Sequence, residues 1–294
     1  MIDKLDFILA LARERHFGRA AESCGVTQPT LSAGVKQLEE QMGVLLVNRG
    51  SRFQGFTPEG ERVLEWARRI VGDTRAMRDE INSLRHGLTG RLRIAAIPTA
   101  LAMVAALTTP YRERHPNVQF TIWSRTSTEI LQLLENLQID AGITYLDNEP
   151  VEGLMQAPLY TERYCLFVSD THPYADRPSV TWLEAAQEPL CLLTPNMQNR
   201  RIVDRAFTAV NAHPSPRLET NSIMNLFSSV RSMGLASIMP EYFQNALGPM
   251  EGVKAVPLVE PAVEHAVGLV AVAREPLSPL VAALFAAAKK MTAA

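Results

Sequence analysis

The chain of 294 residues contains only three cysteines, Cys24, Cys165 and Cys191, and they are widely spaced. An odd number without a Cys-x-x-Cys pair excludes a disulfide framework and a cysteine-based metal or redox pair, so we expect buried, reduced thiols. The chain also lacks the run of about 18 apolar residues that a membrane helix needs. Its first residues carry acids where a secretion signal carries bases. These absences predict a cytoplasmic protein with no membrane contact.

The common catalytic and nucleotide-binding motifs are missing as well. There is no Gly-x-Ser-x-Gly, no His-Glu-x-x-His, no phosphate-binding loop and no dinucleotide-binding glycine pattern. The six histidines are scattered, and three of them precede proline, which is typical of turns. We therefore expect no enzymatic activity, no catalytic residue, no metal site and no cofactor.

Charge of one sign is not in excess, because the net charge is −2. Residues 1–87 hold 13 Lys and Arg against 12 Asp and Glu, so residues 88–294 carry a net −3. A DNA-binding module is usually more basic than this, and any DNA contact must depend on where the bases lie. The hydrophobic content of 47% is ample for packed cores, and the length predicts two or three globular units.

Residues 1–46 have the pattern of three short helices. Ala20 and Ala21 allow two helices to cross closely, Gly25 supplies a turn, and Pro29 falls in the first turn of the next helix. In that helix the apolar positions share one face and leave four polar side chains to solvent, namely Gln28, Thr30, Ser32 and Lys36. This arrangement predicts a helix-turn-helix that places a recognition helix in the major groove of DNA. The alternative is an ordinary helical bundle.

A short basic hairpin bounded by glycines follows at residues 48–58 and weighs against the ordinary bundle. It fits a wing whose Arg49 and Arg52 reach backbone phosphate or a narrow minor groove.

The run RAAESCGVTQPTLSAGVKQLEEQMGVLLVNRGSRFQGFTPEG resembles the signature of LysR-type transcription regulators. In that family RAA, V-x-Q-P-x-L-S, LE and T-P-x-G recur in this order. The positions that the resemblance assigns to DNA contact are Gln28, Pro29, Ser32, Arg49 and Arg52. Ala33 and Gly34 depart from the family, which usually carries longer polar side chains there, and this departure predicts a thinner base readout.

Residues 59–87 contain an apolar seam with alternating spacings of four and three. Its members are Val63, Ala67, Ile70, Thr74, Met77, Ile81 and Leu84. Such a seam favours pairing with a second helix, whereas the alternative is one amphipathic helix packed on its own domain. The resemblance implies a dimerising linker helix here, and a homotetramer assembled through the sensor domains.

After a hinge-like break at residues 87–90, strands alternate with helices. Residues 91–145 read as βαβαβ, which predicts a parallel sheet covered by helices. A second such unit begins at residue 163, with strands at 165–169, 190–194, 218–221 and 235–239, and a last strand and helix occupy 265–274 and 279–291. The resemblance implies that these last elements return to the first lobe of a two-lobed, periplasmic-binding-protein-like α/β sensor domain.

The expected domains are therefore an α-helical winged helix-turn-helix at 1–58, a linker helix at 59–87 and an effector-binding domain at 88–294. Within the last, lobe I comprises 88–162 and 266–294, and lobe II comprises 163–265.

Ligands of open α/β sheets bind at the carboxyl ends of strands, beside helix N-termini. Hydroxyl, amide and basic side chains converge at those places, which predicts a site for a small carboxylate or another anion. The predicted effector-binding residues are Thr99, Thr126, Ser127, Thr128, Asn196, Arg200 and Asn221. The alternative is that the Ser, Thr and Asn side chains are ordinary helix caps.

The run LLTPNMQNRR is similar to LysR-type regulators associated with formate dehydrogenase operons, which implies a role in formate metabolism. The expected partners are double-stranded DNA, a small-molecule effector and further copies of the chain, with RNA polymerase as a candidate. Two other functions stay open. One is a DNA-binding protein without a ligand. The other is a redox sensor, which the apolar surroundings of Cys165 and Cys191 disfavour.

Overall fold

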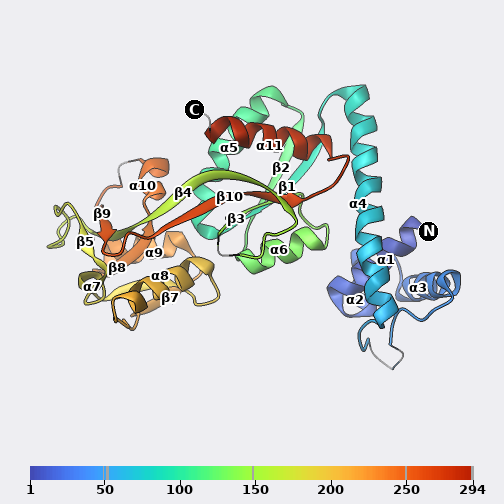
Figure 1. Ribbon diagram of the computed structural model, residues 1–294, viewed down its shortest axis with the longest axis horizontal. Coiled ribbons are helices and arrows are strands. Elements are labelled where there is room, and N and C mark those ends of the chain that lie inside the picture. The colour runs from blue at the N-terminus through green and yellow to red at the C-terminus, as the bar shows by residue number, and fades with distance from the viewer. Residues whose placement is uncertain (49, 51–52, 148, 249, 293–294) are drawn as a thin grey trace. The chain divides into compact units, whose positions relative to one another are not determined.

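The computed structural model describes the whole chain except residues 49, 51–52, 148, 249 and 293–294. It divides into two compact units (Figure 1). The first unit consists of Met1–Leu88 with two short returning segments, Glu135–Gln138 and Arg274–Leu280. The second unit consists of the remaining residues.

The first unit begins with three short helices, α1 (Ile2–Glu14), α2 (Phe17–Ser23) and α3 (Gln28–Met42). Side chains cap the last two of them: His16 Nδ1 accepts from Gly18 N at 3.1 Å, and Thr27 Oγ1 accepts from Thr30 N at 3.4 Å. Apolar residues at helical spacing pack the three helices around one core, whose fully buried members include Ile8, Leu11, Ala20, Leu31 and Leu38. The predicted helix-turn-helix is confirmed.

Gly34 belongs to the inner face of α3. A β-carbon at this position would lie 2.5 Å from Cδ2 of Phe7 in α1. The interpretation that Gly34 thins the DNA-reading face is therefore wrong: the missing side chain lets α3 approach α1. Ala33, by contrast, is exposed.

A hairpin and a long helix complete the first unit. Val47 and Phe56 form an antiparallel bridge, and Asn48 N donates to Gly55 O at 3.0 Å. Arg49 and Arg52, the predicted wing contacts, lie outside the described residues. Helix α4 (Pro58–His86) follows and is capped by Thr57, whose Oγ1 accepts from Gly60 N at 2.9 Å.

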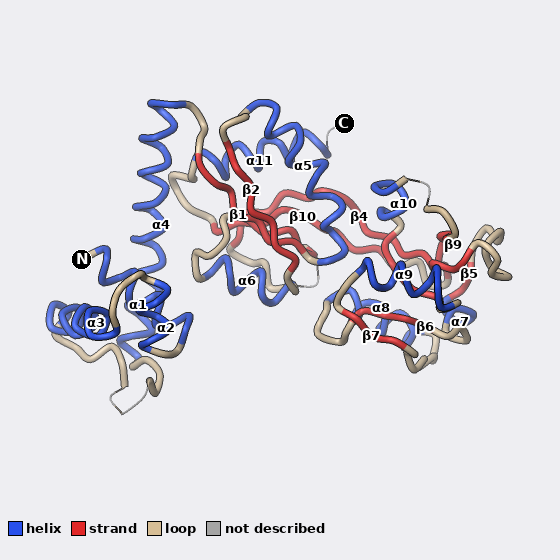
Figure 2. Tube along the Cα trace, turned by 180° about the vertical axis from the view of Figure 1, so that it is seen from behind, coloured by secondary structure: helices blue, strands red, loops and turns tan. Residues whose placement is uncertain are grey.

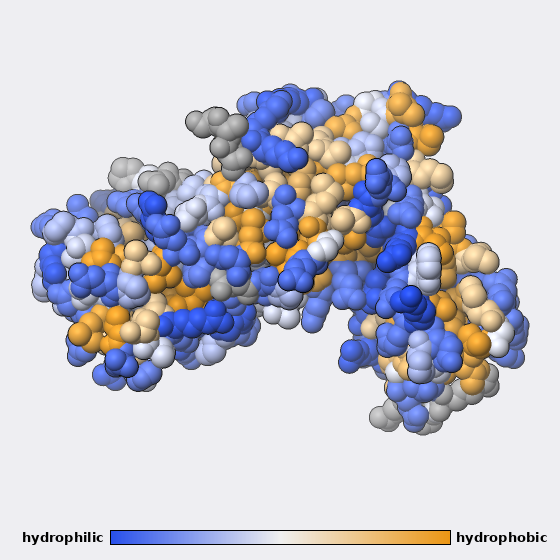
Figure 3. Space-filling view, viewed as in Figure 1, coloured by the Kyte–Doolittle hydropathy of each residue, from blue (hydrophilic) through white to orange (hydrophobic). Residues whose placement is uncertain are grey.

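The predicted seam of α4 is divided between two environments. Val63 and Ala67 pack into the N-terminal core. The later apolar side chains of the seam are exposed to solvent by between 40% and 79%. They are Ile70, Met77, Ile81 and Leu84. Figure 3 shows apolar surface at the upper end of α4. A stripe of this length, open to solvent within one copy of the chain, is typical of a helix that pairs with another.

Around Gly72, α4 also contacts a segment that comes much later in the chain. The guanidinium of Arg274 lies against Gly72, where a β-carbon would collide with it. Arg274 Nη1 donates to Arg69 O and to Asp73 Oδ1, each at 3.2 Å, and Nη2 donates to Arg68 O at 3.2 Å. Gly72 thus lets a distant segment pack directly on the helix backbone.

The second unit is built on a sheet with the strand order β2-β1-β3-β10-β4-β8-β6-β7. In lobe I the strands β1 (Gly90–Ala96), β2 (Val118–Ser124) and β3 (Ala141–Tyr145) are parallel. They are connected by the 3-10 turn η1 (Pro98–Ala100) with helix α5 (Leu101–Arg114), and by helix α6 (Ser127–Glu135). This is the predicted βαβαβ arrangement.

Lobe II repeats the arrangement with β6 (Leu190–Leu193), β7 (Leu218–Thr220) and β8 (Ala236–Pro240), which are also parallel. Helices α8 (Gln198–Ala209) and α9 (Ile223–Met233) connect them. The smaller elements of this lobe are β5 (Val180–Thr181), α7 (Trp182–Ala185), α10 (Tyr242–Leu247) and β9 (Val253–Val259).

Two antiparallel strands, β4 (Leu154–Ser169) and β10 (Glu264–Val272), run between the lobes (Figures 1 and 2). After its pairing with β10, strand β4 continues in lobe II between β8 and β9, and α11 (Pro279–Thr292) follows β10. The sequence predicts only residues 165–169 of β4 as strand, because Pro158, Glu162 and Arg163 interrupt its apolar alternation. The two-lobed α/β fold itself is confirmed.

Candidate functional site

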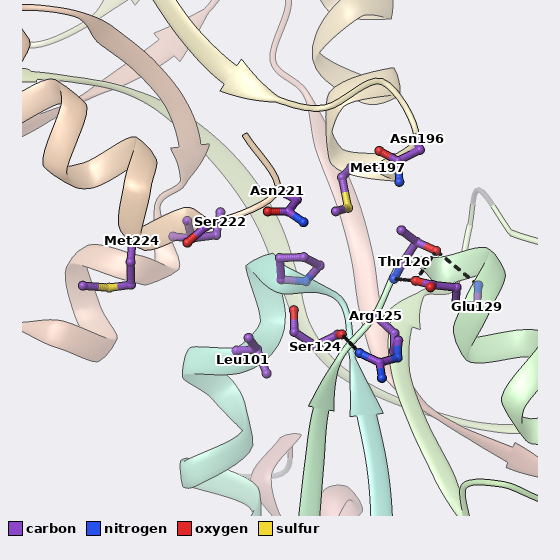
Figure 4. A pocket seen from close by; sticks show the side chains of 12 residues that line it. Leu101, Ser124, Arg125, Thr126, Glu129, Asn196, Met197, Asn221, Ser222 and Met224 are labelled. Carbon is purple, nitrogen blue, oxygen red and sulfur yellow. Dashed lines mark hydrogen bonds between the residues drawn. The ribbon is translucent and has the colours of Figure 1, made fainter. Parts of the chain in front are cut away.

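The two lobes of the second unit share a polar cavity of about 490 Å³, where strand ends and helix starts meet (Figure 4). Lobe I contributes η1 and the turn from β2 into α6, and lobe II contributes the segments before α8 and α9. The lining residues are Pro98, Leu101, Ser124, Arg125, Thr126, Glu129, Asn196, Met197, Asn221, Ser222, Ile223 and Met224.

The start of α6 forms one wall of this cavity. Thr126 N and Oγ1 donate to Glu129 Oε2 at 2.8 and 2.9 Å, and Glu129 N donates back to Thr126 Oγ1 at 3.2 Å. This reciprocal capping means that the Thr126 hydroxyl serves the helix, as the cap alternative expects. The helix start still brings the partial positive charge of the α6 dipole to the cavity.

Three buried polar atoms next to this lining have no hydrogen-bond partner among the described residues. They are Thr99 Oγ1, Ser127 Oγ and Asn199 Nδ2. Thr99 and Ser127 directly follow the lining residues Pro98 and Thr126, and Asn199 lies in the first turn of α8, two positions after Met197. Leaving a buried polar atom without a partner costs about 1–3 kcal/mol. A ligand that supplies the missing partners would recover much of that free energy.

The predicted effector residues fall into three groups. Thr126, Asn196 and Asn221 line the cavity. Thr99 and Ser127 are buried beside it, exposed by only 1% each. Thr128 and Arg200 are not among the lining residues.

Arg200 makes its contacts within lobe II. Its Nε donates to Asp204 Oδ1 at 2.8 Å, and its Nη1 donates to Leu193 O at 2.8 Å and to Glu219 Oε1 at 2.5 Å. The side chain is only 10% exposed, so it joins α8 to β6 and β7. The α8 residue that has a donor without a partner is instead Asn199. In the sequence, nothing distinguishes Asn199 from the other polar residues at the start of this helix.

A second polar cluster surrounds Glu162 of β4, which is 1% exposed. Glu162 Oε1 accepts from the hydroxyls of Tyr145 at 2.6 Å and Tyr164 at 2.8 Å, and Oε2 accepts from the Tyr160 hydroxyl at 3.4 Å. Burial raises the pKa of Glu162, and hydrogen bonds from these hydroxyls oppose the shift. Sequence reasoning did not single out this acid, because residue 162 lies before the predicted strand at 165–169 and its burial depends on the longer β4.

The predicted DNA-reading face lies on α3 (Gln28–Met42). Gln28, Pro29 and Thr30 form its first turn and are exposed, as is Lys36, whereas Ser32 is half-buried. Lys36 Nζ lies 3.7 Å from Glu40 Oε1, a surface pair that leaves the ammonium accessible. The exposed residues form a polar face opposite the core of the helix-turn-helix.

The cysteines lie in apolar surroundings. Cys165 and Cys191 are buried, and desolvation raises the pKa of the first thiol to about 12 and of the second to about 11. Cys24 is partly buried, and burial raises its pKa as well. A thiol with a raised pKa holds little of the thiolate that reacts with oxidants.

Across the described part of the chain, no group of three or more His, Cys, Asp or Glu side chains could hold a metal ion. None of the described helices combines the length and apolar character needed to cross a bilayer.

A helix-turn-helix unit followed by a long helix and a two-lobed α/β unit with a polar cavity defines the class of DNA-binding regulators that carry an effector-binding domain. The chain belongs to the LysR family. Residues 85–293 match the LysR substrate binding domain, and residues 2–61 match the family model described as bacterial regulatory helix-turn-helix protein, lysR family.

Relatives and solved structures agree with this assignment. The chain is 28% identical over 281 residues to the hydrogen peroxide-inducible genes activator of Haemophilus influenzae, covering 95% of this chain and 92% of the relative. A full-length OxyR variant from Pseudomonas aeruginosa superposes with a TM-score of 0.76 at 24% identity, covering 98% of this chain and 97% of that one. The effector binding domain of QuiR in complex with shikimate gives a TM-score of 0.59 at 22% identity, covering 69% and 96%. These proteins are transcription regulators and not enzymes, as the sequence predicts.

Proposed function

We propose that this regulator binds a small organic anion in the cavity between the two lobes of its effector-binding domain, and that the anion changes its engagement with DNA. The observation that carries the proposal is the set of three buried, unpartnered polar atoms of Thr99, Ser127 and Asn199. Two come from lobe I and one from lobe II. A carboxylate accepts several hydrogen bonds at once, so one bound anion would serve donors of both lobes.

The charges around the cavity also support a small anion. Arg125 lines it, and the start of α6 adds partial positive charge. QuiR, which shares the fold, holds shikimate, a carboxylate. The similarity of LLTPNMQNRR to regulators associated with formate dehydrogenase operons makes formate the first carboxylate to examine.

Calorimetry on the full chain with formate, acetate, succinate and inorganic phosphate tests the proposal. Thr99→Val keeps the side-chain shape and removes one unpartnered hydroxyl, so we expect it to weaken binding about tenfold, the equivalent of roughly 1–2 kcal/mol. Thr128→Val is the matched control, because Thr128 is exposed and does not line the cavity. Absence of binding for all four anions, or equal affinities of wild type and Thr99→Val, would contradict the proposal.

Peroxide sensing is the second candidate, because the Haemophilus influenzae relative is named for induction by hydrogen peroxide. The cysteines of this chain favour the anion instead. Cys165 and Cys191 are 2% and 0% exposed, and the raised pKa values keep both thiols protonated near neutral pH. A peroxide-responsive thiol needs the thiolate and access to solvent.

The remaining parts of the proposal concern partners and boundaries. DNA binding at the chromosome implies a cytoplasmic protein, with RNA polymerase as a candidate partner. The exposed stripe of α4 supports a homodimer, which a second contact through the effector-binding domains would extend to a homotetramer. We propose functional boundaries at 1–58 for DNA binding, 59–87 for the linker and 88–294 for effector binding.

A further inference from the structure

Glu162 is a buried acid whose carboxyl accepts hydrogen bonds from neutral donors. Its strand, β4, continues from the sheet of lobe I into that of lobe II, and its carboxyl accepts from Tyr145 of β3 as well as from Tyr160 and Tyr164 of β4. Burial and the neighbouring acid raise the pKa values of Tyr145 and Tyr164 well above the ordinary value, so both hydroxyls keep their protons. The carboxyl is thereby fixed in place without a formal positive charge.

The charged groups near this cluster are already engaged with other partners. Arg200 of α8 pairs with Asp204 and Glu219, and Arg201 pairs with Glu149 at 3.3 Å. Arg163 of β4 pairs with Glu264 at 2.7 Å. Among the described residues, no ion pair joins Glu162 to a cation.

The other elements packed around the cluster present uncharged or weakly basic groups. From β10, the His265 ring lies 6.2 Å from that of Tyr145, and its Nδ1 is 2.9 Å from Asp147 Oδ2. From α10, Tyr242 stacks on Tyr160 with ring centroids 5.0 Å apart. The His265 ring therefore packs on Tyr145, one of the three tyrosines that donate to Glu162.

The cluster adjoins the polar atoms that lack partners. Thr99 is close enough to Tyr145, and Asn199 to Glu162, to lower the pKa of the group that each one faces. Neither Thr99 Oγ1 nor Asn199 Nδ2 makes a hydrogen bond of good geometry with a described residue. An anion that engages these two atoms would therefore arrive next to the Glu162 carboxyl. Two negative charges close together in a buried site repel one another strongly when no cation pairs with the buried acid.

We propose that the cavity binds its anion only when the Glu162 carboxyl carries a proton, so that the regulator responds to the anion and to pH together. This inference rests on the proposed function of the cavity. It adds that Glu162 takes up one proton when the anion binds. A protonated Glu162 removes the repulsion and keeps its hydrogen bonds to the tyrosines. Because burial already raises the pKa of Glu162, the proton is held more readily than by a solvated glutamate.

Calorimetry of the full chain with formate and acetate, from about pH 6 to about pH 9, tests the inference, since both probes keep their charge over that range. Above the pKa of Glu162 in the free protein, we expect the affinity of the wild type to fall about tenfold per pH unit. Titrations at one pH in two buffers with different enthalpies of ionisation count the protons taken up. We expect about one proton per anion in that range, a result that needs no variant.

Two variants assign the proton. Glu162→Gln mimics the protonated carboxyl, so its affinity should not change with pH and should equal or exceed that of the wild type at high pH. Glu149→Gln is the matched control: its side chain is also buried, 7% exposed, but it is paired with Arg201. We expect Glu149→Gln to keep the pH dependence.

The outcomes separate the inference from the proposed function. Binding that does not change with pH in the wild type, with no proton uptake, overturns the inference and leaves the anion site standing. The same pH dependence in Glu162→Gln as in the wild type also overturns it. Failure of both probes to bind at any pH counts against the proposed function and the inference together.

Discussion

Glu129 Oε2 accepts hydrogen bonds from both the amide and the hydroxyl of Thr126, which places an acid on the wall of the cavity that we propose to bind an anion. Glu129→Gln keeps an acceptor for the cap and removes the charge. We expect it to raise the affinity for a bound carboxylate severalfold, because one repulsive charge is lost from the wall. It should lower the stability of the domain by about 0.5–2 kcal/mol through a weaker cap. Calorimetry with formate and thermal unfolding measure the two effects, and a lower affinity would show that Glu129 helps to hold the ligand.

Arg200 should matter for the stability of lobe II and not for ligand affinity. Arg200→Ala removes hydrogen bonds to Asp204, Glu219 and the Leu193 carbonyl, so we expect a loss of about 1–3 kcal/mol in the free energy of unfolding. Denaturant titration measures the loss, and calorimetry on the folded variant measures the affinity. A much weaker affinity without loss of stability would return Arg200 to the effector site that the sequence predicts.

The exposed stripe of α4 should hold two copies together. The double variant Met77→Glu, Ile81→Glu replaces two apolar side chains that are exposed by 56% and 49% in one copy, so each copy should still fold. Pairing of two such helices would bury carboxylates without partners, which is costly. We expect sedimentation to show a smaller species and operator affinity to fall, because the two half-sites are no longer bound together. Glu80→Gln, at another exposed position of α4, is the control. An unchanged size for the double variant would remove α4 from the interface.

DNA binding should separate into base recognition and phosphate contact. Gln28 is exposed in the first turn of α3, so Gln28→Ala should weaken binding to the specific operator by about 1–3 kcal/mol and relax the preference at one base pair of each half-site. Arg52→Ala should weaken binding to all sequences and reduce the salt dependence by about one unit of slope. Mobility shifts on specific and scrambled DNA at several salt concentrations distinguish the two effects. Unchanged binding by both variants would contradict the predicted DNA contacts.

The thiols should resist oxidation in the folded protein. Because Cys165 and Cys191 are buried with raised pKa values, a thiol-specific reagent should label them only after unfolding, and the partly buried Cys24 should react first in the native state. Peptide mass analysis after brief labelling assigns the sites. Rapid native labelling of Cys165 or Cys191, together with DNA binding that changes on peroxide treatment, would favour peroxide sensing.

The pH dependence of stability should report Glu162. Its pKa is higher in the folded chain than in the unfolded one, so its contribution is fully present below the unfolded value near 4.5 and is lost as pH rises through the folded value. We expect Glu162→Gln to gain stability relative to the wild type over this window. Thermal unfolding of both proteins across the window measures the difference, and parallel profiles would show that Glu162 stays ionised.

Local patterns were enough to predict much of this architecture. The helix-turn-helix follows from apolar spacing and a glycine turn, and the βαβαβ order of lobe I follows from alternation, since both depend on neighbours in sequence. The position of the cavity follows from where parallel strands end. The direction of Arg200 does not, because the rotation of α8 is set by its contacts with β6 and β7. Glu162 was not predicted for a similar reason: the sequence predicts strand only from residue 165, and Tyr145 of β3 comes within hydrogen-bond distance of Glu162 only in the folded domain.

The contact of Arg274 with Gly72 has a consequence for the order in which the molecule is made. Helices α1 to α3 and the first turns of α4 find their apolar partners among residues synthesised early, most of them before residue 72. The guanidinium that bonds Asp73 is synthesised 201 positions later. On the ribosome, the helix-turn-helix can therefore fold long before the middle of α4 makes its contact with Arg274. A chain that ends before Arg274 would keep the helix-turn-helix but would lack the contact that Arg274 makes with the middle of α4.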